Sequence, residues 1–231
     1  PLESHAHDGS IVSDSTGRDP TYRRGHTRGM TNLEREPSPR PLVGILLFDD
    51  VEVLDFAGPY EVCSGTRDPS GHPYVDVVTV GPRSEISCRG GLRVRPDHVI
   101  EDCPPLDALI VPGGPGADER TPVQDQLILP FLRERAGSTA TVASVCTGAF
   151  LLGRAGLLDG RRATTHTAAV EALRREFPAV NVVTAKVVDE GPIATAAGVS
   201  SGIDLGLHLF ERWFGTAARA RAAQGLDGPW R

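Results

Sequence analysis

The chain has 231 residues, of which 39% are hydrophobic and 23% charged, and its formal net charge is -6 at pH 7. This composition is typical of a globular chain long enough for one sizeable core. The acidic balance argues against nucleic-acid binding, which needs clustered Lys and Arg, and no apolar run approaches the ~20 residues that a membrane span needs.

Residues 1–41 differ from the rest of the chain. They are rich in Gly, Pro, Ser and charged residues, and their apolar residues are too sparse to build a core face. We expect this segment to be a disordered N-terminal extension. Residues 42–231 are then predicted to form a single α/β domain.

Strand and helix patterns alternate from residue 42 onward. Apolar or alternating runs predict strands at 42–48, 74–80, 108–114, 139–145, 180–189 and 193–197. The Gly58-Pro59 pair predicts a helix with Pro59 at its first position, and Thr121-Pro122 predicts a cap and first residue of a helix that runs to about 136. Further helices are predicted at 147–158, at 168–177 and from about 201 onward.

The alternation predicts the fold class. Parallel strands joined by right-handed helical crossovers form a sheet that is covered on both faces. Ligands of such sheets bind beyond the carboxyl ends of the strands. Asp55 follows the first predicted strand, Gly113 and Gly114 end a middle one, and Cys146 ends the strand after that, so we expect them to converge at that edge.

Cys146 lies in TVASVCTGAFLLG (141–153), which resembles a nucleophile elbow. Such a strained strand-to-helix turn needs small residues two positions before and after it, and these are Ser144 and Gly148. The N-terminus of the following helix is expected to lower the thiol pKa from ~8.5 towards neutrality. The alternative interpretation is a buried structural cysteine at a strand end.

The neighbours of Cys146 suggest a catalytic pocket. The backbone amides of Gly114 and Thr147 are candidates for an oxyanion hole. Asp55 either caps a helix or carries protons to and from a substrate. His166 is a second candidate base or a structural residue. No histidines or cysteines have the spacing of a zinc site, and Cys63, Cys88 and Cys103 are interpreted as structural thiols.

Four stretches carry a family resemblance: LDFAGPYEV, DCPPLDALIVPGGPG, VASVCTGAFLLGRAGLLDGRRATTH and GVSSGIDLGLHLFE. In this order they resemble the ThiJ/PfpI superfamily over residues 42 to about 215. The resemblance implies a flavodoxin-like, class I glutamine-amidotransferase-like three-layer sandwich with a mostly parallel sheet. Within the superfamily, the stretches most specifically resemble the isonitrile hydratases and the sensor halves of AraC-type regulators.

The resemblance to isonitrile hydratases implies site roles. Cys146 is then the nucleophile, Asp55 the general acid and base that also activates water, and Thr147 an assisting residue. Gly113, Gly114, Gly148, His166 and Thr167 are expected around the oxyanion and the pocket; relatives usually carry a bulky aromatic at the position of Thr167. The substrate is a small molecule, no metal or organic cofactor is needed, and a homodimer is implied.

Two other functions stay open at this point. One is a non-catalytic small-molecule-binding domain related to the regulator sensors, although only residues 215–231 follow Phe214, too few for helix-turn-helix domains. The other is a different superfamily activity, such as glyoxal hydration or amide hydrolysis, which the lack of a histidine directly after Cys146 disfavours. The absence of C-x-x-C pairs and of a leader-like apolar stretch favours a cytoplasmic protein.

Overall fold

The computed structural model describes residues 40–230. The disorder predicted for residues 1–41 falls almost wholly outside this range. Its last two residues lie within it and are anchored: Arg40 forms an ion pair with Asp76 at 3.0 Å, and the Pro41 carbonyl accepts a hydrogen bond from the Asp76 amide at 2.9 Å. The described part of the chain therefore begins just before the first strand.

The described residues form a larger sheet and two small two-stranded ones. The strands are β1 (Leu42–Leu46), β2 (Asp76–Gly81), β3 (Ile86–Ser87), β4 (Arg93–Val94), β5 (His98–Val99), β6 (Ala108–Val111), β7 (Thr141–Val145), β8 (Arg162–Ala163), β9 (Asn181–Val182), β10 (Val187–Asp189) and β11 (Ile193–Ala196). The main sheet has the order β10-β11-β7-β6-β1-β2-β5 and is parallel except for β10, which is antiparallel to β11.

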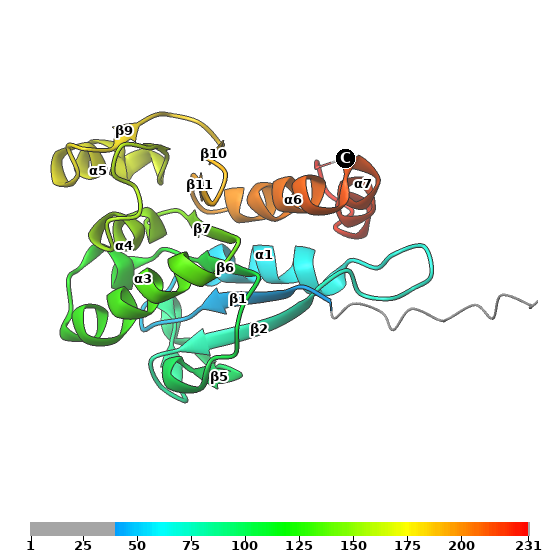
Figure 1. The fold of residues 1–231 in the computed structure, drawn as a ribbon, viewed down its shortest axis with the longest axis horizontal. Helices are drawn as coiled ribbons and strands as arrows, with labels where there is room; N and C mark the ends of the chain where they lie inside the picture. The colour runs from blue at the N-terminus through cyan, green and yellow to red at the C-terminus, as the bar shows by residue number, and fades with distance from the viewer. Residues whose placement is uncertain (1–39, 231) are drawn as a thin grey trace, which may run out of the picture. The chain divides into compact units, whose positions relative to one another are not determined.

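Helices connect the strands. The α-helices are α1 (Val53–Gly65), α2 (Pro115–Asp118), α3 (Leu129–Ser138), α4 (Gly148–Arg154), α5 (Val170–Glu176), α6 (Ser201–Phe214) and α7 (Thr216–Gly225). Short 3₁₀ turns occur at η1 (Arg89–Gly91), η2 (Ile100–Asp102) and η4 (Thr167–Ala169), and η3 (Gln124–Ile128) is a π-helical stretch that leads into α3. Figure 1 shows α1 and α6 on one side of the sheet and α3 and α4 on the other. The predicted fold class is confirmed.

The sheet changes direction beside β1. The connection through α1 leads from β1 to β2, whereas the connection through α3 leads from β6 to β7 in the opposite direction along the sheet. Right-handed crossovers that leave in opposite directions place their helices on opposite faces and open a crevice at the carboxyl ends of the strands between them. The sequence places its candidate site residues at this crevice.

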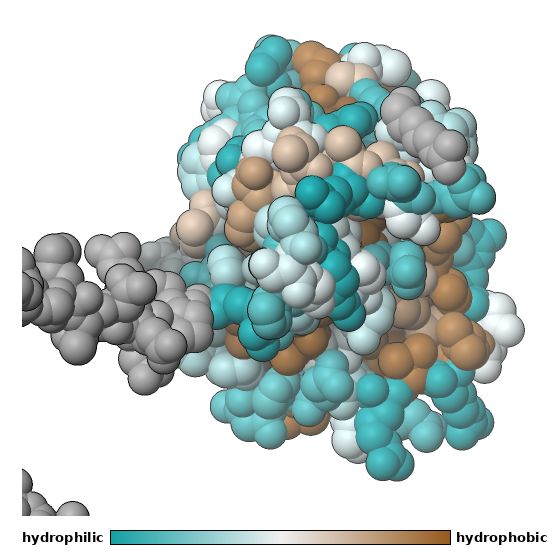
Figure 2. Space-filling view, turned by 90° about the vertical axis from the view of Figure 1, so that its right-hand side faces the viewer, coloured by the Kyte–Doolittle hydropathy of each residue, from teal (hydrophilic) through white to brown (hydrophobic). Residues whose placement is uncertain are grey.

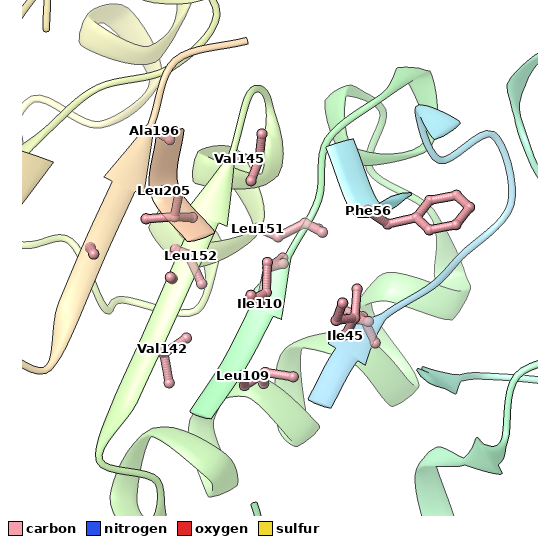
Figure 3. Close-up of a cluster of buried hydrophobic side chains, with 14 of the residues drawn as sticks. Ile45, Phe56, Leu109, Ile110, Val142, Val145, Leu151, Leu152, Ala196 and Leu205 are labelled. Atoms are coloured by element: carbon pink, nitrogen blue, oxygen red, sulfur yellow. The ribbon is translucent and has the colours of Figure 1, made fainter. Parts of the chain in front are cut away.

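Apolar side chains on both faces of the central strands hold the layers together (Figure 3). Ile45 of β1, Ile110 of β6 and Val142 of β7 are at most 1% exposed, and helical residues such as Leu151 cover them. Strands buried on both faces read as nearly continuous apolar runs, which is why their positions were predictable.

The first helix begins earlier than predicted. It starts at Val53, and Pro59 lies inside it rather than at its first position. Proline has no N–H, so the Asp55 carbonyl lacks the donor that the next turn would supply. Gly202 of α6 packs here: a Cβ at Gly202 would lie 3.3 Å from the Asp55 carbonyl oxygen and 3.1 Å from Pro59 Cδ. Close packing by α6 thus accommodates the proline within the helix.

Of two other predicted elements, one differs from the structure and one agrees with it. The run 180–189 is divided between β9 and β10, because β9 pairs with β8 and β10 pairs with β11 in a different sheet. The helix predicted from Pro122 is confirmed, since Thr121 Oγ1 accepts a hydrogen bond from the Gln124 amide at 3.2 Å as an N-cap.

The surface of the described part is mixed in character. On the face shown in Figure 2, several small hydrophobic patches lie among hydrophilic residues. Among residues 40–230 we find no helix with both the length and the apolar character required to cross a bilayer. All four cysteines are free thiols, and all four are buried.

Candidate active site

Cys146 occupies a strained turn between β7 and α4. Its φ of 57° is in the left-handed region, which non-glycine residues rarely adopt. The turn is held by hydrogen bonds from the Cys146 amide to the carbonyls of Ala196 and Ala197, at 3.0 and 2.9 Å, and from Thr165 Oγ1 to the Cys146 carbonyl at 2.9 Å. This is the geometry predicted for an elbow.

Small residues make this turn possible, as the sequence suggested. A Cβ at Gly148 would overlap the carbonyl oxygens of Val111 and Pro112. The start of α4 therefore lies directly against the end of β6, which a larger residue would prevent. Ser144, on the other side of Cys146, is completely buried.

Asp55 lies beneath the cysteine, in the first turn of α1. Its side chain is fully buried, and its Oδ2 accepts a hydrogen bond from the Gly113 amide at 3.0 Å. Its Oδ1 receives no N–H or O–H donor, and the carboxyl interacts instead with the Cys146 thiol. Asp55, Gly113 and Cys146 thus meet as predicted, although they come from three different connections of the sheet.

Burial raises the pKa of both members of this pair. Desolvation raises the pKa of Asp55 to about 7, against the opposing effect of the Gly113 hydrogen bond. Desolvation and the negative charge of Asp55 raise the pKa of Cys146 to about 12. The sequence-based expectation of a lowered Cys146 pKa was therefore wrong, because the hydrogen bond that the Thr147 amide offers the sulfur does not offset burial next to a carboxylate. The resting cysteine is a thiol beside a carboxyl group that titrates near neutral pH.

Thr147 contacts the glycine turn after β6. Its Oγ1 accepts a hydrogen bond from the Gly114 amide at 2.9 Å and donates one to the Gly114 carbonyl at 3.2 Å. The Thr147 amide faces the Cys146 sulfur. Of the two amides predicted to form an oxyanion hole, that of Thr147 is placed for the role, and that of Gly114 is occupied by the Thr147 hydroxyl.

His166 reaches the site, but not as a base through Nδ1. This nitrogen accepts a hydrogen bond from the Ala168 amide at 3.2 Å and caps the following 3₁₀ turn. A neutral imidazole with an accepting Nδ1 carries its proton on Nε2 and is a donor there. Gly198 allows the close approach, since a Cβ there would overlap His166 and lie 3.0 Å from Cys146 Sγ. Thr167, the neighbour, is exposed.

A cavity of about 260 Å³ opens over the sulfur. It is lined by Glu52, Arg89, Gly114, Pro115, Asp118, Cys146, Thr147, His166 and Val199. Sequence reasoning placed four of these residues at the site and missed Glu52, Arg89, Pro115, Asp118 and Val199. Asp118 is the one with a sequence signal, because it directly follows the glycine turn PGGPGA. Thr167, which was expected at the pocket, is not among the lining residues.

The mouth of the cavity carries an ion pair. Arg89 Nη1 lies 2.6 Å from Glu52 Oε2, and the Arg89 amide donates to the Val51 carbonyl at 3.0 Å. Within residues 40–230 no three His, Cys, Asp or Glu side chains are grouped as a metal site would require. The arrangement offers a thiol, a buried carboxyl that can take its proton, and a polar chamber for a small molecule.

Comparisons with known proteins agree with this geometry. The model of the DJ-1/PfpI family matches residues 42–212. An isonitrile hydratase of Pseudomonas putida is 39% identical over 176 residues, which cover 75% of this chain and 72% of that protein. The HTH-type transcriptional regulator GbdR of Pseudomonas aeruginosa is 28% identical over 183 residues, 79% of this chain and 49% of the regulator, so the chain spans about half of that protein's length.

Solved structures share the fold. A THiJ/PfpI family protein from Pseudomonas syringae has a TM-score of 0.71 and 25% identity, covering 88% of this chain and 84% of that one. Schizosaccharomyces pombe DJ-1 has a TM-score of 0.66 and 17% identity, covering 81% of this chain and 99% of its own. The similarity to the Schizosaccharomyces pombe protein concerns the fold alone.

Proposed function

Because the chain belongs to the DJ-1/PfpI family, with an isonitrile hydratase among its relatives, we propose that it hydrates isonitriles to N-substituted formamides. The observation that carries this proposal is the buried contact between the Cys146 thiol and the Asp55 carboxyl, next to a cavity for a small molecule. The reaction needs a nucleophile for an electron-poor carbon and a group that moves one proton, and this pair supplies both.

The first half of the proposed reaction forms a covalent adduct. Asp55, as a carboxylate, takes the proton of the Cys146 thiol while the sulfur attacks the terminal carbon of R–N≡C. Asp55 then delivers that proton to the same carbon, which gives the thioimidate Cys–S–CH=N–R. The carboxylate is regenerated, and the thioimidate itself carries no charge.

The second half releases the product. Water adds to the thioimidate carbon, the nitrogen gains a proton, and the carbon–sulfur bond breaks to give R–NH–CHO and the free thiol. The Thr147 amide is placed beside the sulfur, where it stabilises the thiolate as it leaves. One water is consumed for each isonitrile, and sulfur and carboxylate both return to their starting states.

The test is turnover of cyclohexyl isocyanide, followed as formamide formation. We expect activity in the wild type and its loss in Cys146→Ala and Asp55→Asn, with both variants folded by circular dichroism. If the wild-type protein, its thiol shown to be free by titration, converted none of a panel of alkyl and aryl isonitriles, the proposal would be wrong.

A second candidate is a non-catalytic small-molecule-binding domain, favoured by the similarity to regulators such as GbdR. The same cavity serves this function without chemistry at the sulfur. Calorimetric titration separates the two: a saturable ligand that binds Cys146→Ala as tightly as the wild type, without any product, would support a sensor.

A further inference from the structure

The second half of the proposed reaction needs a base that water can reach, and Asp55 does not provide one. Asp55 is fully buried and is not among the residues that line the cavity. Its contacts are the Gly113 amide on one side and the Cys146 sulfur on the other.

Asp118 is a carboxyl group on the accessible side of the sulfur. It lines the cavity with Cys146, Thr147 and His166, and it is exposed to solvent. Its carboxyl interacts with the side chain of Thr147, the residue after the cysteine. Asp118 is therefore beside the place where water meets the adduct.

The backbone holds Asp118 in position. Arg154 donates to the Asp118 carbonyl at 2.8 Å and to the Ala117 carbonyl at 2.7 Å. Gln124 Nε2 donates to the Gly116 and Glu119 carbonyls, both at 2.5 Å. Such a clamped turn presents its side chain at a fixed place, as a general base requires.

The other acid–base groups of the cavity are engaged elsewhere. Glu52 is paired with Arg89, whose Nη1 donates to Glu52 Oε2 at 2.6 Å. His166 uses Nδ1 to accept from the Ala168 amide. Among the described residues, no side-chain ion pair within 4 Å includes Asp118. Desolvation raises its pKa, although the interaction with the Thr147 side chain and the charge of Arg154 oppose this.

We propose that Asp118 is the general base that activates water against the covalent adduct, whereas Asp55 serves the thiol alone; this inference rests on the proposed hydratase function. Water adds its oxygen to the thioimidate carbon and gives one proton to Asp118, which passes it to the nitrogen. Asp118 next takes the hydroxyl proton as the carbon–oxygen double bond forms and the carbon–sulfur bond breaks. It returns that proton to the departing sulfur and is a carboxylate again.

The experiment is intact-mass spectrometry of Asp118→Asn during reaction with cyclohexyl isocyanide. We expect an adduct heavier by one isonitrile to form at about the wild-type rate and to accumulate, while steady-state turnover falls ~100-fold or more. Glu119→Gln, on the same turn but outside the cavity, is the matched control and should behave as the wild type. In Asp118→Ala, added formate should restore part of the turnover.

The outcomes separate the inference from the function on which it rests. Wild-type turnover that Asp118→Asn retains without any adduct would overturn the role of Asp118 and leave the hydratase intact. Slow adduct formation in a folded Asp118→Asn would also overturn it, since Asp118 would then act by positioning Thr147 and Cys146. If the wild type did not react with isonitriles, the function would be wrong and the inference would fall with it.

Discussion

At the scale of single residues, the central feature is a buried thiol beside a buried carboxyl. Neither group is in its solution state, since burial raises the pKa of both Asp55 and Cys146. A cysteine that stays protonated at rest is a poor target for other electrophiles, because the thiolate is the reactive form. Reactivity then depends on the carboxylate beside it.

The first prediction concerns the pH dependence of turnover. Asp55 takes the thiol proton only when it is ionised, so kcat/KM for an isonitrile should rise about tenfold per pH unit below about 7 and level off above it. Stopped-time assays from pH 5 to 9 measure this. A profile that is flat down to pH 5 would contradict the role of Asp55.

The second prediction concerns the stability cost of Asp55. Its folded pKa is raised, so the folded state keeps a proton that the unfolded chain has already lost at pH 4 to 7. Stability is therefore lost as the pH rises through this window, by about 1.4 kcal/mol per unit. In Asp55→Asn the side chain at this position does not titrate. The variant's free energy of unfolding in urea should therefore exceed that of the wild type by more at pH 8 than at pH 5. If this difference in unfolding free energy decreased as the pH rose, Asp55 would be ionised in the folded state.

The sequence identified part of this site. Cys146, Asp55 and Gly113 could be predicted because each follows a strand, and parallel strands end at one edge. Arg89 could not, because its place depends on how a loop folds over that edge, and Asp118 was missed although it directly follows the glycine turn after β6. The direction of the Cys146 pKa was wrong for the same reason: a helix start is visible in the sequence, and the depth of burial around the sulfur is not.

At the scale of secondary-structure elements, the fit of α4 against the end of β6 decides whether the elbow forms. Gly148 fills a space that has no room for a Cβ beside two carbonyl oxygens. Backbone groups, unlike side-chain ends, cannot rotate away, so a methyl group here must move a helix or a strand.

A pair of Gly→Ala substitutions tests this. Gly148→Ala should destabilise the fold by about 1–3 kcal/mol or more and reduce turnover. Gly137→Ala in α3 is the control: its Cβ would meet nothing within 4 Å, so helix propensity should stabilise the protein by roughly 0.5 kcal/mol. Thermal melts of both variants test this. Equal melting temperatures for Gly148→Ala and Gly137→Ala would contradict the packing argument.

Helix and strand positions were largely predictable, and the exceptions have local causes. Thr121 was correctly identified as a cap from the cap-proline pair. Pro59 was misplaced because proline is most favoured at a helix start, whereas here the preceding residues already form a turn of α1. The division of 180–189 into β9 and β10 depends on which strands they pair with, which a continuous β-prone run does not reveal.

At the scale of the whole molecule, the family resemblance implies a homodimer. The net charge of -6 will make two copies repel each other weakly at low ionic strength. We expect light scattering after size exclusion in 0.15 M salt to give twice the chain mass of 24.6 kDa. A mass of one chain at micromolar concentration would contradict this expectation.

The close approach of Gly202 to the Asp55 carbonyl links the C-terminal part of the chain to the chemistry. Because α1 packs on α6 at this point, the size of the residue at position 202 limits how closely the two helices approach. A methyl group at Gly202 would require one of the two helices to give by a few tenths of an ångström, although position 202 does not line the cavity. We therefore expect a substitution remote from the substrate to alter the reaction rate through the position of α1.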